Sequence, residues 1–232
     1  MTNEEVKNII FAKSVLPREE AGKMYFRFFH NWAENHKYIY KKFNINFNDK
    51  ILDIGCGVGH NLIHFNKNSV GVEKDEKFFN FAKNIGLDVR NLNIEDDFFN
   101  LKGENFEIIW CADFLVHLAS PFKFLCECRN VLASQGKIVI QIPLMSALNK
   151  HKSSCHLYAF NKKSLIYLLE ICGYKIIKTS GCARRLPGFL NFIFEPLLQI
   201  FGTNIWVFAE KEKEPRFNKN KLFFPKWINR NL

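Results

Sequence analysis

The sequence lacks the cysteine patterns of a disulfide framework and of a zinc ribbon. Its 232 residues include seven cysteines, an odd number, and no two of them form a C-x-x-C pair. A disulfide framework needs an even set of cysteines, and a zinc ribbon needs C-x-x-C pairs. The sequence therefore predicts reduced thiols in a cytoplasmic protein.

A hydrophobic run that could span a bilayer without interruption is also missing. The most apolar stretch, 186–208, contains two prolines, two glycines and several polar residues. Residues 1–15 carry Glu4 and Glu5 and only a short apolar patch, unlike a secretion signal. We expect no transmembrane span and a cytoplasmic location.

Acidic residues are few relative to basic ones. There are 23 Asp and Glu against 33 Lys and Arg, a formal net charge of +10. Such an excess can indicate a nucleic-acid or anionic-membrane partner. However, 25 of the 33 cations are lysine, and asparagine and phenylalanine also number 25 each, as in proteins of A/T-rich genomes. Because phosphate recognition favours arginine, the charge alone does not predict a nucleic-acid partner.

From Lys50 onward, short apolar runs alternate with glycine turns and helical segments. The expected strands are 51–54, 69–72, 89–92, 106–110, 137–142, 175–179 and 205–209. The expected helices between them are 61–66, 76–85, 121–133 and 163–172. This alternation predicts a doubly wound α/β fold with a mostly parallel sheet. A long aromatic insert, 180–204, joins the last two strands without a conventional crossover helix, which favours an antiparallel last strand.

A glycine turn follows the first expected strand. Residues 53–59 read D-I-G-C-G-V-G, and glycines there let the chain bend sharply and let a ligand lie against the main chain. Glu73 closes the second strand, 18 residues after Gly55, where a carboxylate can hold the two hydroxyls of a ribose. Together these features predict an adenosine-containing cofactor.

Two details disfavour NAD as that cofactor. The third glycine or alanine of the usual NAD pattern falls at His60. Asp53, directly before the glycines, would repel a pyrophosphate but could favour a cationic sulfonium cofactor that carries an ammonium group.

On these residues the sequence resembles the class I S-adenosylmethionine-dependent methyltransferase superfamily. The resemblance covers nearly all of 50–178, and its pieces in order are ILDIGCGVG, GVEKDEKFFNFAK, NIEDD, FEIIWCADFLVHLASP, VLASQGKIVIQIP and HLYAFNKKSLIYLLEICGY. The sequence looks most like the small-molecule group that includes quinone-biosynthesis, sugar and antibiotic methyltransferases. The resemblance implies a Rossmann-like sheet of seven strands with the last one antiparallel. It also implies S-adenosyl-L-methionine as cofactor and S-adenosyl-L-homocysteine as product.

The resemblance further implies which residues bind this cofactor. The glycine loop would lie under its methionine part with Asp53 near the ammonium, Glu73 would bind the ribose, and the residues after the third strand would flank adenine. The family often has aspartate where this sequence has Asn93, whose amide can still accept a hydrogen bond. The expected cofactor-binding residues are Asp53, Gly55, Cys56, Gly57, Gly59, Glu73, Lys74, Asn93, Ile94, Cys111 and Ala112.

Three histidines are candidates for the catalytic base. Transfer to a hydroxyl requires alignment of the acceptor and removal of its proton, a task suited to histidine. His117, His151 and His156 all follow carboxyl ends of expected strands, where open α/β sheets bind ligands. We expect His117 or His156 to be catalytic; for each, the alternative is a histidine that only stabilises a loop. In quinone O-methyltransferases a metal is held at places that correspond to Asp113, Val116 and His117, and because valine cannot ligate, no metal is expected.

The family's usual positions for a lid and an acceptor pocket are both aromatic in this sequence. We expect an N-terminal helical lid (1–48), a cofactor-binding core (49–210) with 180–204 as an acceptor cap, and a basic aromatic tail (211–232). The residues expected to contact the acceptor are Tyr25, His151, Arg184 and Arg185, and Lys150 and Lys152 could help them clamp a phosphate or carboxylate. The expected acceptor is a small molecule, such as a sugar or phosphate-like precursor of a bacterial surface polysaccharide.

Two other functions stay open at this point. The positive charge and the basic aromatic tail would suit an RNA or protein methyltransferase, although the sequence has no D-P-P-Y-like tetrapeptide and no appended RNA-binding module. An intact glycine turn with Glu73 argues only for cofactor binding, so a non-catalytic partner protein is the third interpretation. Oligomeric state is not predicted.

Overall fold

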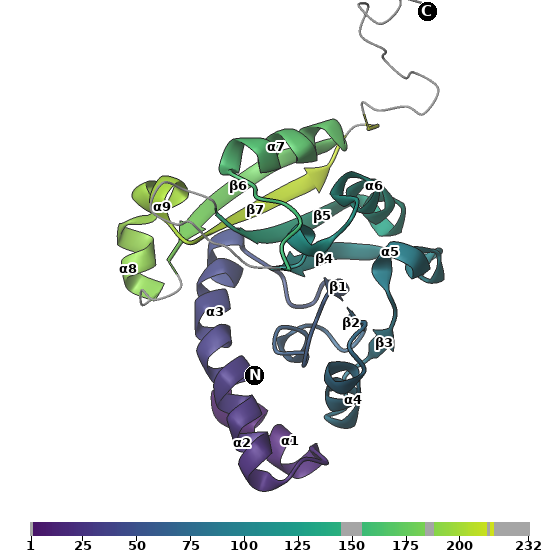
Figure 1. Cartoon of the computed structure of the whole chain (residues 1–232), viewed down its shortest axis with the longest axis vertical. Helices are drawn as coiled ribbons and strands as arrows, with labels where there is room; N and C mark the ends of the chain where they lie inside the picture. The colour runs from purple at the N-terminus through teal and green to yellow at the C-terminus, as the bar shows by residue number, and fades with distance from the viewer. Residues whose placement is uncertain (1, 145–154, 184–187, 213, 216–232) are drawn as a thin grey trace, which may run out of the picture.

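A computed structural model describes residues 2–144, 155–183, 188–212 and 214–215, which together form one α/β unit (Figure 1). The sequence predictions for Lys150, His151, Lys152, Arg184, Arg185 and most of the basic tail fall outside these residues.

Seven strands form a single sheet in the order β3-β2-β1-β4-β5-β7-β6. The strands β1 to β5 pair in parallel, whereas β7 pairs antiparallel with both β5 and β6. The predicted doubly wound, mostly parallel sheet with an antiparallel last strand is therefore confirmed. The strand bounds are β1 (Ile51–Ile54), β2 (Val70–Glu73), β3 (Val89–Asn91), β4 (Phe106–Ala112), β5 (Leu132–Pro143), β6 (Tyr174–Cys182) and β7 (Asn204–Lys211).

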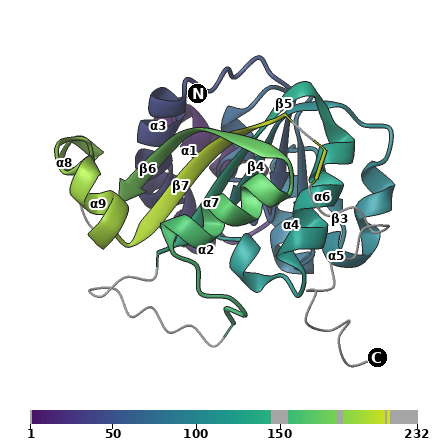
Figure 2. The ribbon, with the colours of Figure 1, turned by 90° about the horizontal axis from the view of Figure 1, so that it is seen from above.

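Helices cover both faces of the sheet (Figures 1 and 2). One face packs against α5 (Ile94–Asp97), α6 (Pro121–Val131) and α7 (Lys162–Ile171), and the other against α3 (Asn31–Phe43) and α4 (Glu76–Asn84). The remaining elements are α1 (Asn3–Lys13), α2 (Arg18–Met24), a π-helical segment η1 (Tyr25–His30), α8 (Gly188–Ile193), α9 (Glu195–Phe201) and the short 3-10 turns η2 (Leu62–His64), η3 (Phe98–Leu101) and η4 (Leu115–His117). Across the described ranges, no helix has the length and apolar character that crossing a bilayer requires.

The segment after the glycine turn differs from the expected helix over 61–66. It forms only the three-residue turn η2, because Asn66 stops further winding: its side-chain oxygen accepts a hydrogen bond from the Asn68 N–H. Asparagine side chains compete with the helical backbone in this way. Asn61, at the start of the turn, is instead held from α3, since its side-chain oxygen accepts a hydrogen bond from the Tyr40 hydroxyl.

A buried aromatic cluster fixes α3 against the sheet. The rings of His36 and Tyr40 on α3 lie 5.9 Å and 5.0 Å from the Trp110 ring on β4, and His36 also contacts Trp206 on β7. All four side chains are at most 5% exposed. Because α3 buries these large rings against β4 and β7, it is a fixed part of the core.

We expect Gly181→Ala to lower the free energy of unfolding by about 3 kcal/mol, since overpacking a tight core is costly. An added Cβ on β6 would lie 2.1 Å from the Leu198 carbonyl carbon and 2.2 Å from the Gln199 nitrogen, both backbone atoms of α9. Urea unfolding measures the effect. Gly22→Ala in α2 is the control, because its Cβ would meet Phe11 at an ordinary 3.6 Å and the change should be neutral or stabilising. Equal stabilities for the two variants would contradict this packing of α9.

Candidate active site

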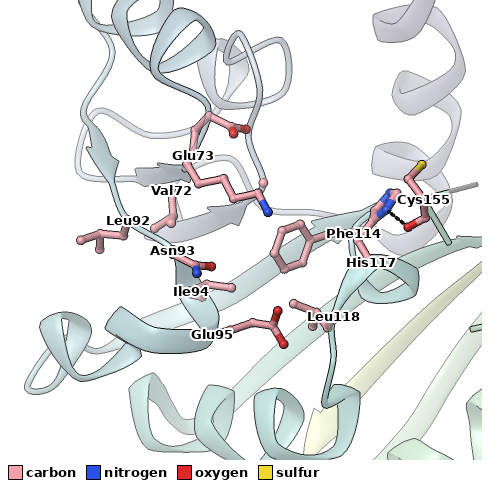
Figure 3. Close-up of a pocket in the computed structure, with 12 residues that line it drawn as sticks. Val72, Glu73, Leu92, Asn93, Ile94, Glu95, Phe114, His117, Leu118 and Cys155 are labelled. Carbon is pink, nitrogen blue, oxygen red and sulfur yellow. Dashed lines mark hydrogen bonds between the residues drawn. The ribbon is translucent and has the colours of Figure 1, made fainter. Parts of the chain in front are cut away.

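A cavity of about 350 Å³ opens at the carboxyl ends of β1 to β4 (Figure 3). This is within the size range of small-molecule sites and lies where open α/β sheets bind ligands. Its lining residues are Gly55, Val72, Glu73, Lys74, Leu92, Asn93, Ile94, Glu95, Phe114, His117, Leu118 and Cys155.

The cavity brings together about half of the predicted cofactor residues. Six residues expected from the sequence line it: Gly55, Glu73, Lys74, Asn93, Ile94 and His117. The side chains of Asp53, Cys56 and Cys111 are instead buried beside it, each at most 1% exposed. The loop glycines Gly57 and Gly59 follow Gly55 in the turn but are not among the lining residues, and nor is Ala112, which ends β4.

The glycine turn has the backbone that its sequence requires. Gly55, Gly57 and Gly59 all have positive φ angles, of 66°, 56° and 82°. A Cβ on Gly55 would lie 2.5 Å from the Phe114 ring, and one on Gly59 would lie 2.2 Å from Leu87. No atom lies within 4 Å of the position of a Cβ on Gly57. The first and third glycines therefore serve packing, whereas the second leaves its main chain open to a ligand.

We expect Gly57→Ala to weaken S-adenosylhomocysteine binding at least about 10-fold, because a Cβ would occupy the space beside the exposed main chain. The unbound protein should lose only about 1–2 kcal/mol of stability, the cost of a left-handed backbone for alanine. Calorimetric titration and urea unfolding measure the two effects.

Gly103→Ala is a matched control for this prediction. Gly103 also has a positive φ, 91°, and also has no atom within 4 Å of an added Cβ, but it lies before the amino end of β4, whereas the Gly57 N–H is bonded to Glu73, which lines the cavity at the carboxyl ends of the strands. It should lose the same stability and keep full binding. Equal binding by both variants would contradict the assignment of Gly57 to the ligand side.

Glu73 is held in place by two backbone donors. Its Oε2 accepts a hydrogen bond from the Gly57 N–H at 2.9 Å, and its Oε1 accepts one from the Asp75 N–H at 2.8 Å. Each carboxylate oxygen keeps a further acceptor position, so the group can still bind two hydroxyls. This arrangement fits the adjacent hydroxyls of a ribose.

The other end of the cavity suits a flat ring. Leu92, Ile94, Phe114 and Leu118 form apolar walls around Asn93 (Figure 3). The Asn93 amide nitrogen donates to Asp96 Oδ2 at 2.5 Å, which orients the amide and leaves its oxygen to accept from a ligand. An adenine ring with its amino group matches these walls and this acceptor.

Asp53 is a buried carboxyl group directly before the glycine turn. It is 1% exposed, and its Oδ2 has no hydrogen-bond partner among the described residues. Burial, together with the nearby negative charge of Glu73, raises the pKa of this carboxyl well above its usual range. A cationic ligand group would stabilise the ionised form, so the site fits a cofactor that carries ammonium and sulfonium charges.

The two predicted catalytic histidines lie next to each other, and His117 lines the cavity. The His117 and His156 ring centroids are 4.8 Å apart, and His117 Nδ1 lies 2.9 Å from the Cys155 carbonyl oxygen. A carbonyl only accepts hydrogen bonds, so Nδ1 carries the proton and Nε2 has a free lone pair. The Leu157 N–H donates a hydrogen bond to the Val116 carbonyl at 2.8 Å. This bond holds η4, which carries His117, beside the segment that carries His156.

Tyr25, which the sequence analysis expected to contact the acceptor, does not line the cavity. Its side chain is 4% exposed and packs with Val6 and Ile10 in a cluster between the N-terminal helices and α4, and its hydroxyl donates to the Asn3 carbonyl. Among the described residues, none of those that line the cavity comes from 2–48. The role of the N-terminal helices as a lid stays a prediction.

Several lining residues were not expected from the sequence: Glu95, Phe114, Leu118 and Cys155. Glu95 directly follows the predicted adenine pair, and its carboxylate accepts a hydrogen bond from the Ala119 N–H at 2.7 Å, which joins α5 to the loop after η4. Cys155 could have been found from the sequence, because it directly precedes the candidate base His156. Nothing in the local pattern marks Phe114 or Leu118.

Known proteins share this domain. Residues 52–140 match a family model described as a methyltransferase domain. The ubiquinone biosynthesis O-methyltransferase of Actinobacillus pleuropneumoniae is 28% identical over 111 residues, which cover 43% of this chain and 47% of that enzyme. The chain thus matches about half the length of that relative. An uncharacterized protein of Methanocaldococcus jannaschii is 27% identical over 186 residues, 79% of each chain.

Solved structures share the whole architecture. An S-adenosylmethionine-dependent methyltransferase from Archaeoglobus fulgidus superposes with a TM-score of 0.60 at 20% identity, over 79% of this chain and 96% of that one. One from Thermotoga maritima, described as a possible histamine N-methyltransferase, superposes with a TM-score of 0.62 at 20% identity, over 88% and 99%. These likenesses establish the fold. The stretch 52–140, which holds the glycine turn and Glu73, matches a methyltransferase domain, and the described chain has the fold of S-adenosylmethionine-dependent methyltransferases.

Proposed function

We propose that the protein transfers a methyl group to a hydroxyl oxygen of a small molecule. The observation that carries this proposal is the position of His117, which lines the cavity with Nδ1 bound to the Cys155 carbonyl and Nε2 able to accept a proton. The similarity to enzymes named as ubiquinone biosynthesis O-methyltransferases supports oxygen as the acceptor atom.

The residues around the cavity would have separate roles in cofactor binding and in proton transfer. S-Adenosylmethionine supplies the electrophilic methyl group and its own leaving group. Glu73, Asn93 and the glycine turn bind and orient the cofactor, and Asp53 favours its cationic end. His117 accepts the hydroxyl proton, and His156, packed against it, supports the same step.

We further propose an anionic acceptor, such as a sugar phosphate or a related precursor of a surface polysaccharide. Support comes from the sequence, in which the basic residues Lys150, His151 and Lys152 come after β5, and Arg184 and Arg185 come after β6; all five are outside the described ranges. Exposed apolar side chains on α9, such as Leu197 at 56%, support a cap on this side. Guanidinium groups bind phosphate through paired hydrogen bonds.

A transfer assay tests the proposal. The protein is incubated with S-adenosylmethionine labelled in its methyl group and with phenols, nucleotide-activated sugars and phosphorylated metabolites. We expect label in a small hydroxyl compound, with transfer by Glu73→Ala strongly reduced when S-adenosylmethionine is below saturation. Label that appears only in added RNA or protein would overturn the proposal in favour of a macromolecular acceptor.

A further inference from the structure

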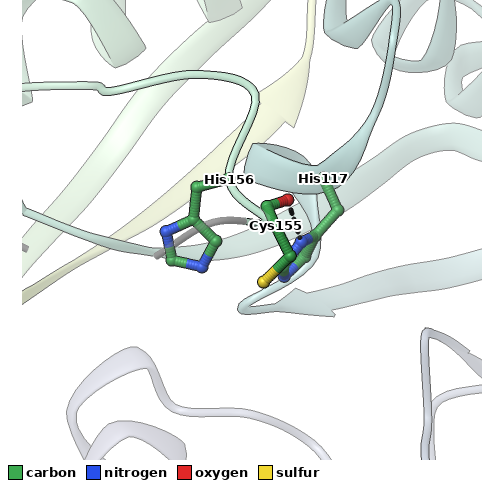
Figure 4. A group of neighbouring side chains, drawn as sticks. All are labelled: His117, Cys155 and His156. Carbon is green, nitrogen blue, oxygen red and sulfur yellow. Dashed lines mark hydrogen bonds between the residues drawn. The ribbon is translucent and has the colours of Figure 1, made fainter. Parts of the chain in front are cut away.

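Three side chains with metal-binding atoms converge at the mouth of the cavity. The imidazoles of His117 and His156 and the Cys155 thiol offer one ligand atom each, and these atoms all lie within 4.8 Å of one another. Figure 4 shows the Cys155 sulfur between the two rings. His117 comes from η4 after β4, and the other two come from the segment that precedes α7, so the cluster joins two separate parts of the chain.

The spacing is close to what a tetrahedral ion requires. Zn–N and Zn–S bonds of roughly 2.0–2.3 Å place ligand atoms about 3.4–3.8 Å apart. Movements of roughly 1 Å would bring three such atoms into coordination distance of one ion. These are small movements for side chains at the surface, and His117 and Cys155 are both exposed.

The backbone under the cluster is already organised. The Leu157 N–H donates to the Val116 carbonyl, and the Tyr158 hydroxyl donates to the Ala119 carbonyl, both at 2.8 Å. These bonds fix the residue next to each histidine, so little chain ordering remains for an ion to impose.

The hydrogen bond of His117 also has the form found in metal sites. A metal-bound histidine usually donates its second ring N–H to a carboxylate or a backbone carbonyl, which fixes the tautomer. His117 Nδ1 does this toward the Cys155 carbonyl, and its Nε2 lone pair remains for an ion.

We propose that His117, Cys155 and His156 bind a zinc ion, with its fourth position open to the cavity. Two imidazoles and a thiolate suit zinc and do not suit magnesium or calcium, which prefer oxygen ligands. The set differs from the arrangement that includes positions 113 and 116, and the proposal departs from the sequence expectation that no metal is bound. Three protein ligands with one open position are typical of catalytic rather than structural zinc.

The open position gives the ion a role in methyl transfer, and this part rests on the proposed function. An acceptor hydroxyl that coordinates the ion loses its proton to water more readily, so its oxygen becomes a better nucleophile. The zinc site keeps the hydroxyl acceptor of the proposed function but changes the role of His117 from base to zinc ligand, so that the ion activates the acceptor.

Metal titration tests the site without an acceptor. Protein without a histidine tag is reduced, stripped with a chelator and titrated with zinc against a chromophoric competitor, and then with cobalt. We expect one equivalent of zinc and a tetrahedral cobalt spectrum with a thiolate charge-transfer band. Cys155→Ser should abolish that band, and His117→Ala and His156→Ala should each weaken zinc binding about 100-fold or more.

His30→Ala and Cys182→Ser are the controls, since both residues lie outside the cluster, and each should bind zinc like the unmodified protein. Zinc affinity unchanged in Cys155→Ser, or no stoichiometric zinc in the unmodified protein, would overturn the proposal. S-Adenosylhomocysteine binding is measured on the same samples. Protein that binds this product but no zinc would leave the proposed function standing, whereas protein that binds zinc but methylates no small molecule would overturn only the proposed function.

Discussion

Glu73→Ala should lower the affinity for S-adenosylhomocysteine by about 30- to 150-fold. The carboxylate lines the cavity and is oriented by the Gly57 and Asp75 N–H groups, so two charge-assisted hydrogen bonds to a ribose would be lost. Such a loss costs about 2–3 kcal/mol, and a factor of ten in affinity corresponds to about 1.4 kcal/mol. Calorimetric titration of the purified variant measures the change.

Glu76→Gln is the matched control for this substitution. Glu76 lies three residues further along, in the exposed first turn of α4, and does not line the cavity. It should bind S-adenosylhomocysteine like the unmodified protein. Affinity of Glu73→Ala within about threefold of the unmodified protein would mean that the ribose lies elsewhere.

His117→Ala should reduce kcat by about 10²- to 10⁴-fold on the acceptor found in the transfer assay, the range of general acid–base catalysis. The side chain is at the cavity wall and offers the lone pair of Nε2, whereas the glycine turn and Glu73 are untouched. Affinity for S-adenosylhomocysteine should therefore stay within about threefold. Initial rates at saturating cofactor and calorimetric titration separate the two effects.

The cause of the loss can be resolved with two further variants. His30→Ala, an exposed histidine of η1, should keep full activity. If His117 is a base that acts alone, Cys155→Ser should remain active; if a zinc ion activates the acceptor, Cys155→Ser should lose activity together with His117→Ala. Full activity of His117→Ala would show that alignment of the acceptor alone carries the reaction.

The order of elements was predictable from the sequence because it depends on local patterns. The apolar runs and the glycine turn located β1 to β4 within one or two residues at most ends. The position of β7 between β5 and β6 was not predictable, since it depends on pairing between segments far apart in the chain. The turn η2 was missed because an asparagine side chain, rather than periodicity, decides where it ends.

The cofactor half of the site was predictable for a different reason. Gly55 directly follows β1, Glu73 ends β2 and Asn93 lies two residues after β3, so their placement comes from the strands themselves. Tyr25 shows the limit of this reasoning, because an aromatic side chain in a helix suits a core as well as a pocket, and only tertiary contacts distinguish the two. The meeting of His117 with Cys155 and His156 likewise depends on a loop that crosses from another part of the sequence.

The positions of the lining residues in the sequence determine which substitutions leave the cavity unchanged. Of the lining residues that the structure describes, all but Cys155 lie between Gly55 and Leu118, and α1 to α3, α8 and α9 contribute none. Substitutions at exposed positions of those helices therefore leave the cavity lining unchanged, and if the helices bind the acceptor, as proposed above, acceptor preference can change independently of the cofactor. Cys155 is the exception, and the segment around it is where the two preferences would have to evolve together.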